Sequence, residues 1–151
     1  MPRFRRLLAA AVGALAVAGL LTACQKPAPE VSVLGGGTVI RITPSTYCFD
    51  TSHCRKQVLD LPTVTLGADD KALIDVPHTV KSNGWQVQAL SLQDITKVLG
   101  ASGPITDSHS YRVASNAADG SPFLVRVDEL DGGKPDGSTW SFVVKVSQTK
   151  S

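Results

Sequence analysis

The chain has 151 residues, of which 42% are hydrophobic, 19% are charged and 5% are aromatic. Its formal net charge is +2. Removing Arg3, Arg5 and Arg6 with the first 23 residues leaves 12 of the 15 basic residues against 13 acidic ones, which is a net charge of −1. A near-neutral domain without a basic run lacks the electrostatic signature of a nucleic-acid-binding protein.

The first predicted element is an export signal over residues 1–23. Arginines precede an apolar run over 7–21, and small residues follow it, which is typical of a secretory signal peptide. The run is shorter than the roughly 20 residues that a helix needs to cross a bilayer, so a permanent transmembrane helix is the weaker interpretation. Arg5 and Arg6 leave twin-arginine export open, although Phe4 precedes them where that signal usually has a polar residue.

The segment Leu21-Thr22-Ala23-Cys24 resembles the lipobox of bacterial lipoproteins in sequence and in position. In that family a diacylglyceryl group is attached to the cysteine sulfur, and the signal is cut before this cysteine. The resemblance implies lipidation of Cys24 and anchoring to the outer face of the cytoplasmic membrane. Two or three acyl chains hold a protein firmly, since each buried methylene adds about 0.8 kcal/mol. An ordinary signal peptide with a chance cysteine is the alternative.

Two cysteines, Cys48 and Cys54, remain if Cys24 carries lipid. Exported proteins occupy oxidising compartments, where such a pair normally forms a disulfide. The loop is short, so the expected stabilisation is about 2 kcal/mol. A metal site with His53 and a redox pair are the alternatives. The sequence has no second cluster at zinc-ligand spacing and no Cys-x-x-Cys motif, so both are weaker interpretations.

After Cys24, residues 25–30 predict a short extended spacer, because they contain two prolines. Short apolar or alternating segments then predict strands over 31–34, 38–43, 57–61, 63–66, 72–76, 85–90, 111–114, 123–130 and 138–148. Turns are expected at 35–37, 67–70, 83–84 and 119–120, and a turn or flexible hairpin loop at 131–137. The alternation of Trp85, Val87 and Ala89 places these three side chains in the core.

One short helix is predicted over 94–99, with Asp94 as its N-cap and Gly100 beyond its end. The glycine triplet at 35–37 is interpreted as a hairpin turn and not as a phosphate-binding loop, because no Gly-Lys-Ser/Thr motif follows. About seven to nine short strands separated by turn residues predict an all-β, antiparallel sandwich, immunoglobulin-like in architecture. We expect a single domain over 31–151.

The mature part also resembles a family of actinobacterial lipoproteins of unknown function. The matching residues are Pro44-Ser45-Thr46-Tyr47-Cys48, Asp50, Cys54, Val76-Pro77, Val80, Trp85 and Gly137-Ser138-Thr139-Trp140. The resemblance implies an actinobacterial envelope, and it brings no reaction, cofactor or ligand with it.

Candidate catalytic and metal-binding residues are few. The three histidines, His53, His78 and His109, have no Gly-x-Ser-x-Gly motif beside them, so hydrolysis by a serine triad has no support. The acidic stretch 128–131 with Asp136 could bind calcium through oxygen ligands, but it lacks EF-hand spacing, and a solvated hairpin loop is the alternative.

Two further groups of charged residues have simple structural interpretations. Asp69 and Asp70 are expected to face water in a turn. Arg41, Arg112 and Arg126 each stand among apolar strand residues and should point outward. If all three shared one face, they would form a patch for anions or lipid headgroups; ordinary surface charges are the alternative.

These observations predict a non-enzymatic binding or assembly module of the cell envelope. Its expected partners are the membrane, through Cys24, and an unknown envelope protein or ligand, with no cofactor, metal or nucleic acid. One alternative is a carrier of a lipid or small apolar ligand, which requires a cavity among core residues Trp85, Val87, Phe123, Trp140 and Phe142. Another is a cell-wall enzyme or enzyme regulator, which requires a cleft where histidine and acidic side chains converge.

Overall fold

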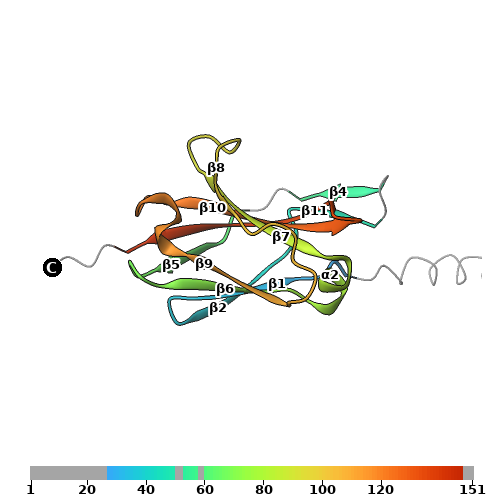
Figure 1. Ribbon diagram of the computed structural model, residues 1–151, viewed down its shortest axis with the longest axis horizontal. Coiled ribbons are helices and arrows are strands. Elements are labelled where there is room, and N and C mark those ends of the chain that lie inside the picture. Colours follow the sequence, from blue (N-terminus) through green and yellow to red (C-terminus); the bar gives the residue numbers. More distant parts are fainter. Residues whose placement is uncertain (1–26, 50–52, 58–59, 148–151) are drawn as a thin grey trace, which may run out of the picture.

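The computed structural model describes residues 27–49, 53–57 and 60–147, and these form two packed β-sheets (Figure 1). Sheet A contains, in spatial order, β2 (Thr38–Ile42), β1 (Val31–Gly35), β6 (Lys71–Asp75) and β9 (Ser110–Ala114). Sheet B contains β4 (Cys54–Lys56), β3 (Thr46–Cys48), β11 (Lys134–Val146), β10 (Phe123–Asp131), β7 (Trp85–Ser91) and β8 (Val98–Ala101), while β5 (Thr63–Leu66) also pairs with β11. The predicted all-β sandwich is confirmed.

The strand pairs are antiparallel except for β5 and β11, which run parallel. Strand β11 is long enough to serve two partners along one edge, first β3 at Thr139 and then β5 from Val143 onward. The described residues contain eleven strands, more than the seven to nine expected. Strands β3, β4 and β8 lie where no strand was expected, and one expected strand, over 57–61, is not formed by the described residues of that segment.

The core follows from the period-two alternation of the strands. Inward side chains of both sheets are buried, and the largest fully buried ones are Trp85, Trp140, Phe123 and Phe142. The hairpin of β1 and β2 closes at Gly36 and Gly37, whose φ angles are 56° and 75°. Positive φ at both central residues is what a two-residue hairpin turn requires, so the predicted glycine turn is confirmed.

Two predictions about the connections are wrong. Asn83-Gly84 is no hairpin turn, since Asn83 ends a helix, α2 (His78–Asn83), that carries the chain from sheet A to sheet B. The predicted helix over 94–99 is a turn followed by β8. Asp94 caps this turn instead, because its Oδ1 accepts from the Thr96 backbone N–H at 3.0 Å.

Two strand boundaries also differ from the prediction. Residues 134–137 belong to β11, so the expected turn or flexible hairpin loop over 131–137 is a turn of only two residues, Gly132 and Gly133. In the segment predicted as a strand over 57–61, Gln57, Asp60 and Leu61 lie in no strand, and 58–59 lie outside the described residues. The remaining short helical element is a 3₁₀ turn, η1 (Ser115–Ala118), between β9 and β10.

The first described residues are held against the sandwich. The indole Nε1 of buried Trp140 donates to the carbonyl oxygen of Pro29 at 2.9 Å. Val31, where β1 begins, and Val146, where β11 ends, lie at opposite ends of the sandwich (Figure 1). Within the described part of the chain, no helix combines the length and apolar character needed to span a bilayer. Cys24 and the predicted signal lie outside the described residues.

Candidate functional site

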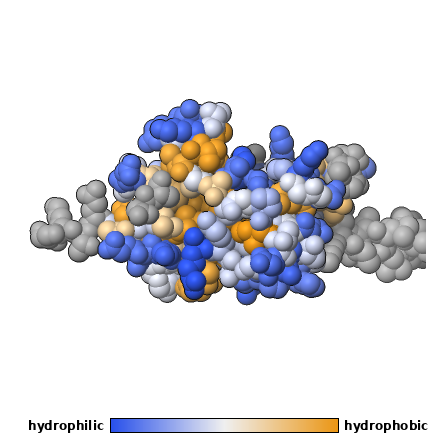
Figure 2. Space-filling model, in the orientation of Figure 1, coloured by the Kyte–Doolittle hydropathy of each residue, from blue (hydrophilic) through white to orange (hydrophobic). Residues whose placement is uncertain are grey.

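A groove lies on the long side of the sandwich, where β8 of sheet B faces β9 of sheet A. This β8–β9 groove has a volume of about 240 Å³ and is lined by Val87, Ala89, 100–102 and 111–114. The buried side chains of Val87, Ala89 and Val113 form an apolar floor. In Figure 2, apolar surface lies beneath the projecting β8 segment and runs down toward sheet A. The groove is therefore an opening between two sheet edges.

Some main-chain N–H and C=O groups of β9 point toward this groove. Ser115 N–H donates to Asp70 O at 3.0 Å, and Val76 N–H donates to His109 O at 2.9 Å. These bonds place the odd-numbered residues of β9 toward β6, since alternate residues of an antiparallel pair bond to the same neighbour. The N–H and C=O groups of the even-numbered residues consequently point away from sheet A.

The even-numbered residues of β9 differ in how many of these main-chain groups are already used. The Ser108 hydroxyl accepts from Ser110 N–H at 3.1 Å and donates to Ser110 O at 2.9 Å, so that residue is satisfied locally. No hydrogen bond among the described residues occupies the outward N–H and C=O groups of Arg112 or the N–H of Ala114, whereas the C=O of Ala114 precedes η1 and serves that turn. An edge of this kind is a template for another strand.

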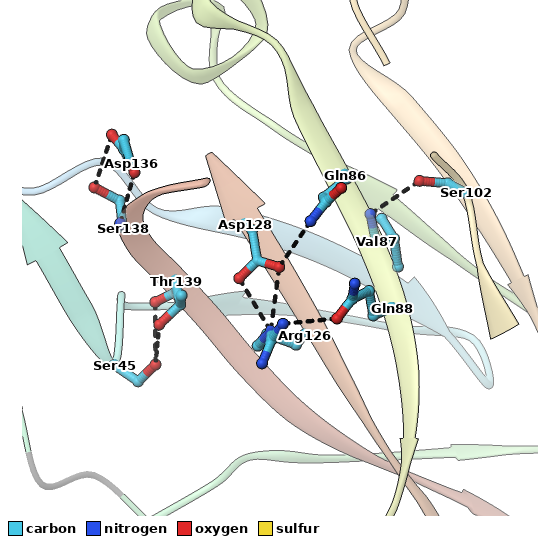
Figure 3. Close-up of polar contacts among 10 residues, drawn as sticks. All are labelled: Ser45, Gln86, Val87, Gln88, Ser102, Arg126, Asp128, Asp136, Ser138 and Thr139. Carbon is cyan, nitrogen blue, oxygen red and sulfur yellow. Dashed lines mark hydrogen bonds and ion pairs between the residues drawn. The ribbon is translucent and has the colours of Figure 1, made fainter. Parts of the chain in front are cut away.

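The opposite wall of the groove is β8. Ser102 N–H donates to Val87 O at 2.9 Å, and the Ser102 hydroxyl accepts from Val87 N–H at the same distance (Figure 3). Gly100 pairs with Ala89 and therefore faces the groove. A Cβ atom at Gly100 would meet no heavy atom within 4 Å, so the space in front of this residue is open.

Arg112 supplies the charge of the groove. It is the single charged residue among the described residues that line it, and its side chain is exposed. No described acidic side chain forms an ion pair with it. It lies on the outer face of sheet A, opposite Leu73, and so stands at the rim above the apolar floor. The groove combines an apolar interior with an unneutralised cation.

The three strand arginines do not share a face. Arg41 and Arg112 lie on the outer face of sheet A but on its two opposite edge strands, while Arg126 lies on the outer face of sheet B. Arg126 is already engaged, because its Nε contacts Asp128 Oδ1 at 3.0 Å and its Nη2 donates to Gln88 Oε1 at 2.6 Å (Figure 3). The condition for a three-arginine patch is therefore not met.

A second, polar pocket of about 270 Å³ lies beside the β3–β4 hairpin. Its lining includes Glu129, which is 6% exposed and accepts a 2.7 Å hydrogen bond from Asn83 Nδ2. Burial raises the pKa of Glu129, the Asn83 bond opposes this, and the charge of Asp136 raises it further. The pKa of Tyr47 in the same pocket is raised by burial and by the charges of Glu129 and Asp136.

The acidic stretch is divided between two surfaces. Asp128 points to the outer face of sheet B, where Gln86 Nε2 donates to it at 3.3 Å (Figure 3). Glu129, Asp131 and Asp136 instead line the polar pocket. Within the ranges that the structure describes, no three His, Cys, Asp or Glu side chains form a group that could hold a metal ion. Asp70 has a turn role, since its Oδ2 accepts from Gly67 N–H at 2.9 Å.

Two of the three histidines come together. The ring centroids of His78 and His109 are 6.1 Å apart, and Nδ1 of His109 lies 3.4 Å from Val76 O. In the described part of the chain, no carboxylate or nucleophilic side chain hydrogen-bonds to this pair. His53 lies apart from them in the β3–β4 hairpin, where its carbonyl accepts from Phe49 N–H at 3.0 Å.

The predicted disulfide between Cys48 and Cys54 is confirmed. The two residues are directly opposite each other in the β3–β4 ladder, next to the pair of Tyr47 and Arg55. A Cβ atom at Gly137 would approach Cys48 Sγ to 2.8 Å, so the hairpin packs closely against β11. The disulfide thus holds a short hairpin of sheet B, at the same end of the sandwich as the start of β1 in sheet A (Figure 1).

The core positions that a carrier would need for its ligand are filled. Trp85, Phe123, Trp140 and Phe142 have no exposed surface, and Val87 is 2% exposed. The sequence matches no protein-family model and none of the curated proteins with which it was compared. Any inference about function therefore rests on the sequence and geometry of this chain itself.

The β8–β9 groove was not predicted from the sequence. The signals for it were present but ambiguous, because Val98-Leu99-Gly100 reads equally as the end of a helix and as a strand. Arg112 was identified as an outward charge, but its position at a groove depends on which strands lie at the sheet edges. Edge positions are set by the order of strands in space, and local patterns do not encode that order.

Proposed function

We infer that this chain is a lipoprotein of an actinobacterial cell envelope, exported through the signal over residues 1–23 and anchored by lipid at Cys24. Its domain is a non-enzymatic binding module at the outer face of the cytoplasmic membrane, and the β8–β9 groove is its binding site. The anchor rests on the lipobox resemblance of Leu21-Thr22-Ala23-Cys24 and on the basic and apolar segments before it.

The spacer supports a position close to the membrane. Cys24 precedes Pro29 by five residues, which span at most about 18 Å. The Trp140 indole fixes Pro29 to the body of the sandwich. The end of the sandwich where β1 begins is consequently held near the lipid surface, and the long side with the groove remains accessible to other envelope components.

The observation that carries the binding function is the pairing of open strand edges with an apolar floor. The unused N–H and C=O of Arg112, the N–H of Ala114 and the buried side chains of Val87 and Val113 meet in one groove. Polar groups that fix an orientation beside an apolar surface are the usual composition of a binding site. At about 240 Å³ the groove is below the roughly 300–1,000 Å³ of small-molecule pockets, which favours a macromolecular partner over a carried ligand.

Fatty-acid labelling in cells tests the anchor. We expect an alkyne-tagged fatty acid to label the wild-type protein and the Cys48→Ser/Cys54→Ser variant, which keeps the lipidation residue but loses both other thiols. Cys24→Ala should lose the label, and the loss of two or more acyl chains should release the mature domain from membranes. The anchor would be refuted if Cys24→Ala were labelled, or if none of the three proteins were labelled.

A further inference from the structure

We propose that the β8–β9 groove binds an extended polypeptide segment, which adds to β9 as a fifth strand of sheet A. The central residue of this segment is acidic and lies opposite Arg112, and its two neighbours are apolar. The inference rests on the proposed function only in taking this groove as the binding site, and it names the chemistry of the partner.

The main chain of β9 is prepared for such an addition. The N–H and C=O groups of Arg112 and the N–H of Ala114 point out of the sheet and have no partner among the described residues. Ser108 satisfies Ser110, so the available edge begins at Arg112. Main-chain hydrogen bonds to an exposed sheet edge supply much of the affinity in strand addition, and pockets for alternate side chains supply specificity.

The alternation of side chains along the added strand determines which of its residues should be charged and which apolar. A residue directly opposite Arg112 shares the outer face of sheet A, because cross-strand neighbours point to the same side. Its neighbours point inward, toward the floor formed by Val87, Ala89 and the open space at Gly100. The groove therefore selects the pattern apolar–acidic–apolar.

A second copy of this chain is the weaker occupant of the same edge. Antiparallel pairing of two β9 strands about Arg112 places two guanidinium groups directly opposite each other, and like charges in that position are unfavourable. Arg112 therefore discourages self-association and favours a partner of opposite charge.

Peptide binding to the full mature protein in lipid nanodiscs tests this inference. The probes are fluorescent, end-blocked peptides Thr-Val-Glu-Val-Thr and Thr-Val-Lys-Val-Thr, measured by anisotropy. The glutamate peptide should bind with a dissociation constant about fivefold lower than that of the lysine peptide, as a cross-strand charge pair predicts. Methylation of the glutamate main-chain nitrogen should abolish binding, because it removes a donor of the added strand.

Matched variants test whether the peptides bind at β9. Arg112→Glu should invert the preference between the two peptides, while Arg41→Glu should leave it unchanged, because Arg41 lies on the same outer face but on the other edge strand, β2. Gly100→Val fills the open space of the groove and should weaken both peptides. Hydrogen exchange should slow in β9 and not in β2 when the glutamate peptide binds.

The inference is overturned if neither peptide binds, if both bind equally, or if Arg112→Glu and Arg41→Glu have the same effect. Protection of β2 in place of β9 would also overturn it. Fatty-acid labelling and peptide preference are separate measurements. A chain that is labelled but shows no peptide preference refutes this inference alone, and a chain that shows the preference without label refutes the anchor alone.

Discussion

At the scale of single residues, Glu129 is the clearest departure from ordinary surface chemistry. The residue as a whole is 6% exposed, and its carboxylate lines the polar pocket, with Asn83 as its hydrogen-bond donor and Asp136 nearby. Burial raises its pKa above the ordinary value of 4.5. The folded protein therefore holds a proton on Glu129 at pH values where the unfolded chain has already released it.

This raised pKa predicts how stability depends on pH. Between 4.5 and the raised pKa the folded state binds more protons than the unfolded state, so the free energy of unfolding falls as pH increases through this window. Glu129→Gln removes the ionisation and can still accept the bond from Asn83. We expect the variant to unfold at higher urea than the wild type at about pH 7, with the difference vanishing at about pH 4.

Urea unfolding at the two pH values measures this difference. Glu30→Gln, which changes an exposed carboxylate near the same end, is the control and should follow the wild type at both. A Glu129→Gln protein less stable than the wild type at neutral pH would contradict the account, because it would mean that the buried charge is favourable.

Other residues illustrate what the sequence could predict about the site. The disulfide partners followed from compartment chemistry and from their number, and these arguments need no three-dimensional information. Arg112 could be predicted to point outward from its apolar neighbours. Its lack of an acidic partner and its position above an apolar floor come from residues far away in the sequence, such as Val87 and Gly100.

At the scale of elements, strand alternation was the most reliable guide. Residues Trp85, Val87 and Ala89 are buried as their spacing predicts, and the long strand that carries Trp140 is confirmed. The connections between strands were harder to predict, because the same residue types occur in different kinds of turn. Asn83-Gly84 favours a hairpin turn, but a glycine also ends a helix, and only the change of sheet between β6 and β7 decides between the two.

Two glycines test how the elements are held together. Gly137 has φ of 103° and lies where a Cβ would come within 2.8 Å of Cys48 Sγ, whereas Gly37 has φ of 75° with nothing within 4 Å. Gly37→Ala should cost about 1 kcal/mol of unfolding free energy from the backbone alone. Gly137→Ala adds a steric conflict to the same strain, so we expect a loss of about 3 kcal/mol.

Chemical denaturation of both variants gives these two losses directly. Equal losses of unfolding free energy in the two variants would show that the β3–β4 hairpin can move away from the added Cβ atom at Cys48 without cost. In that case the β3–β4 hairpin would not be packed against β11 as closely as the contact distance indicates.

At the scale of the whole molecule, the arrangement separates attachment from binding. The first described residues are fixed to one end of the sandwich by the bond between Trp140 and Pro29. Strands β8 and β9, whose residues line the groove, lie between the two ends of the sandwich (Figure 1). The sandwich itself could be predicted from composition and alternation. The groove could not, because it depends on β8 and β9 both being edge strands that face each other across the two sheets.

The measurement that tests this account most directly is the native mass of the protein taken from its own membrane, compared between the wild type and Gly100→Val. The variant changes only the open space of the groove, so its anchor and its fold should be unaffected. The account predicts a wild-type complex with a protein partner and a bare Gly100→Val domain. The same complex in both proteins, or a bare domain in both, would contradict the groove as the binding site.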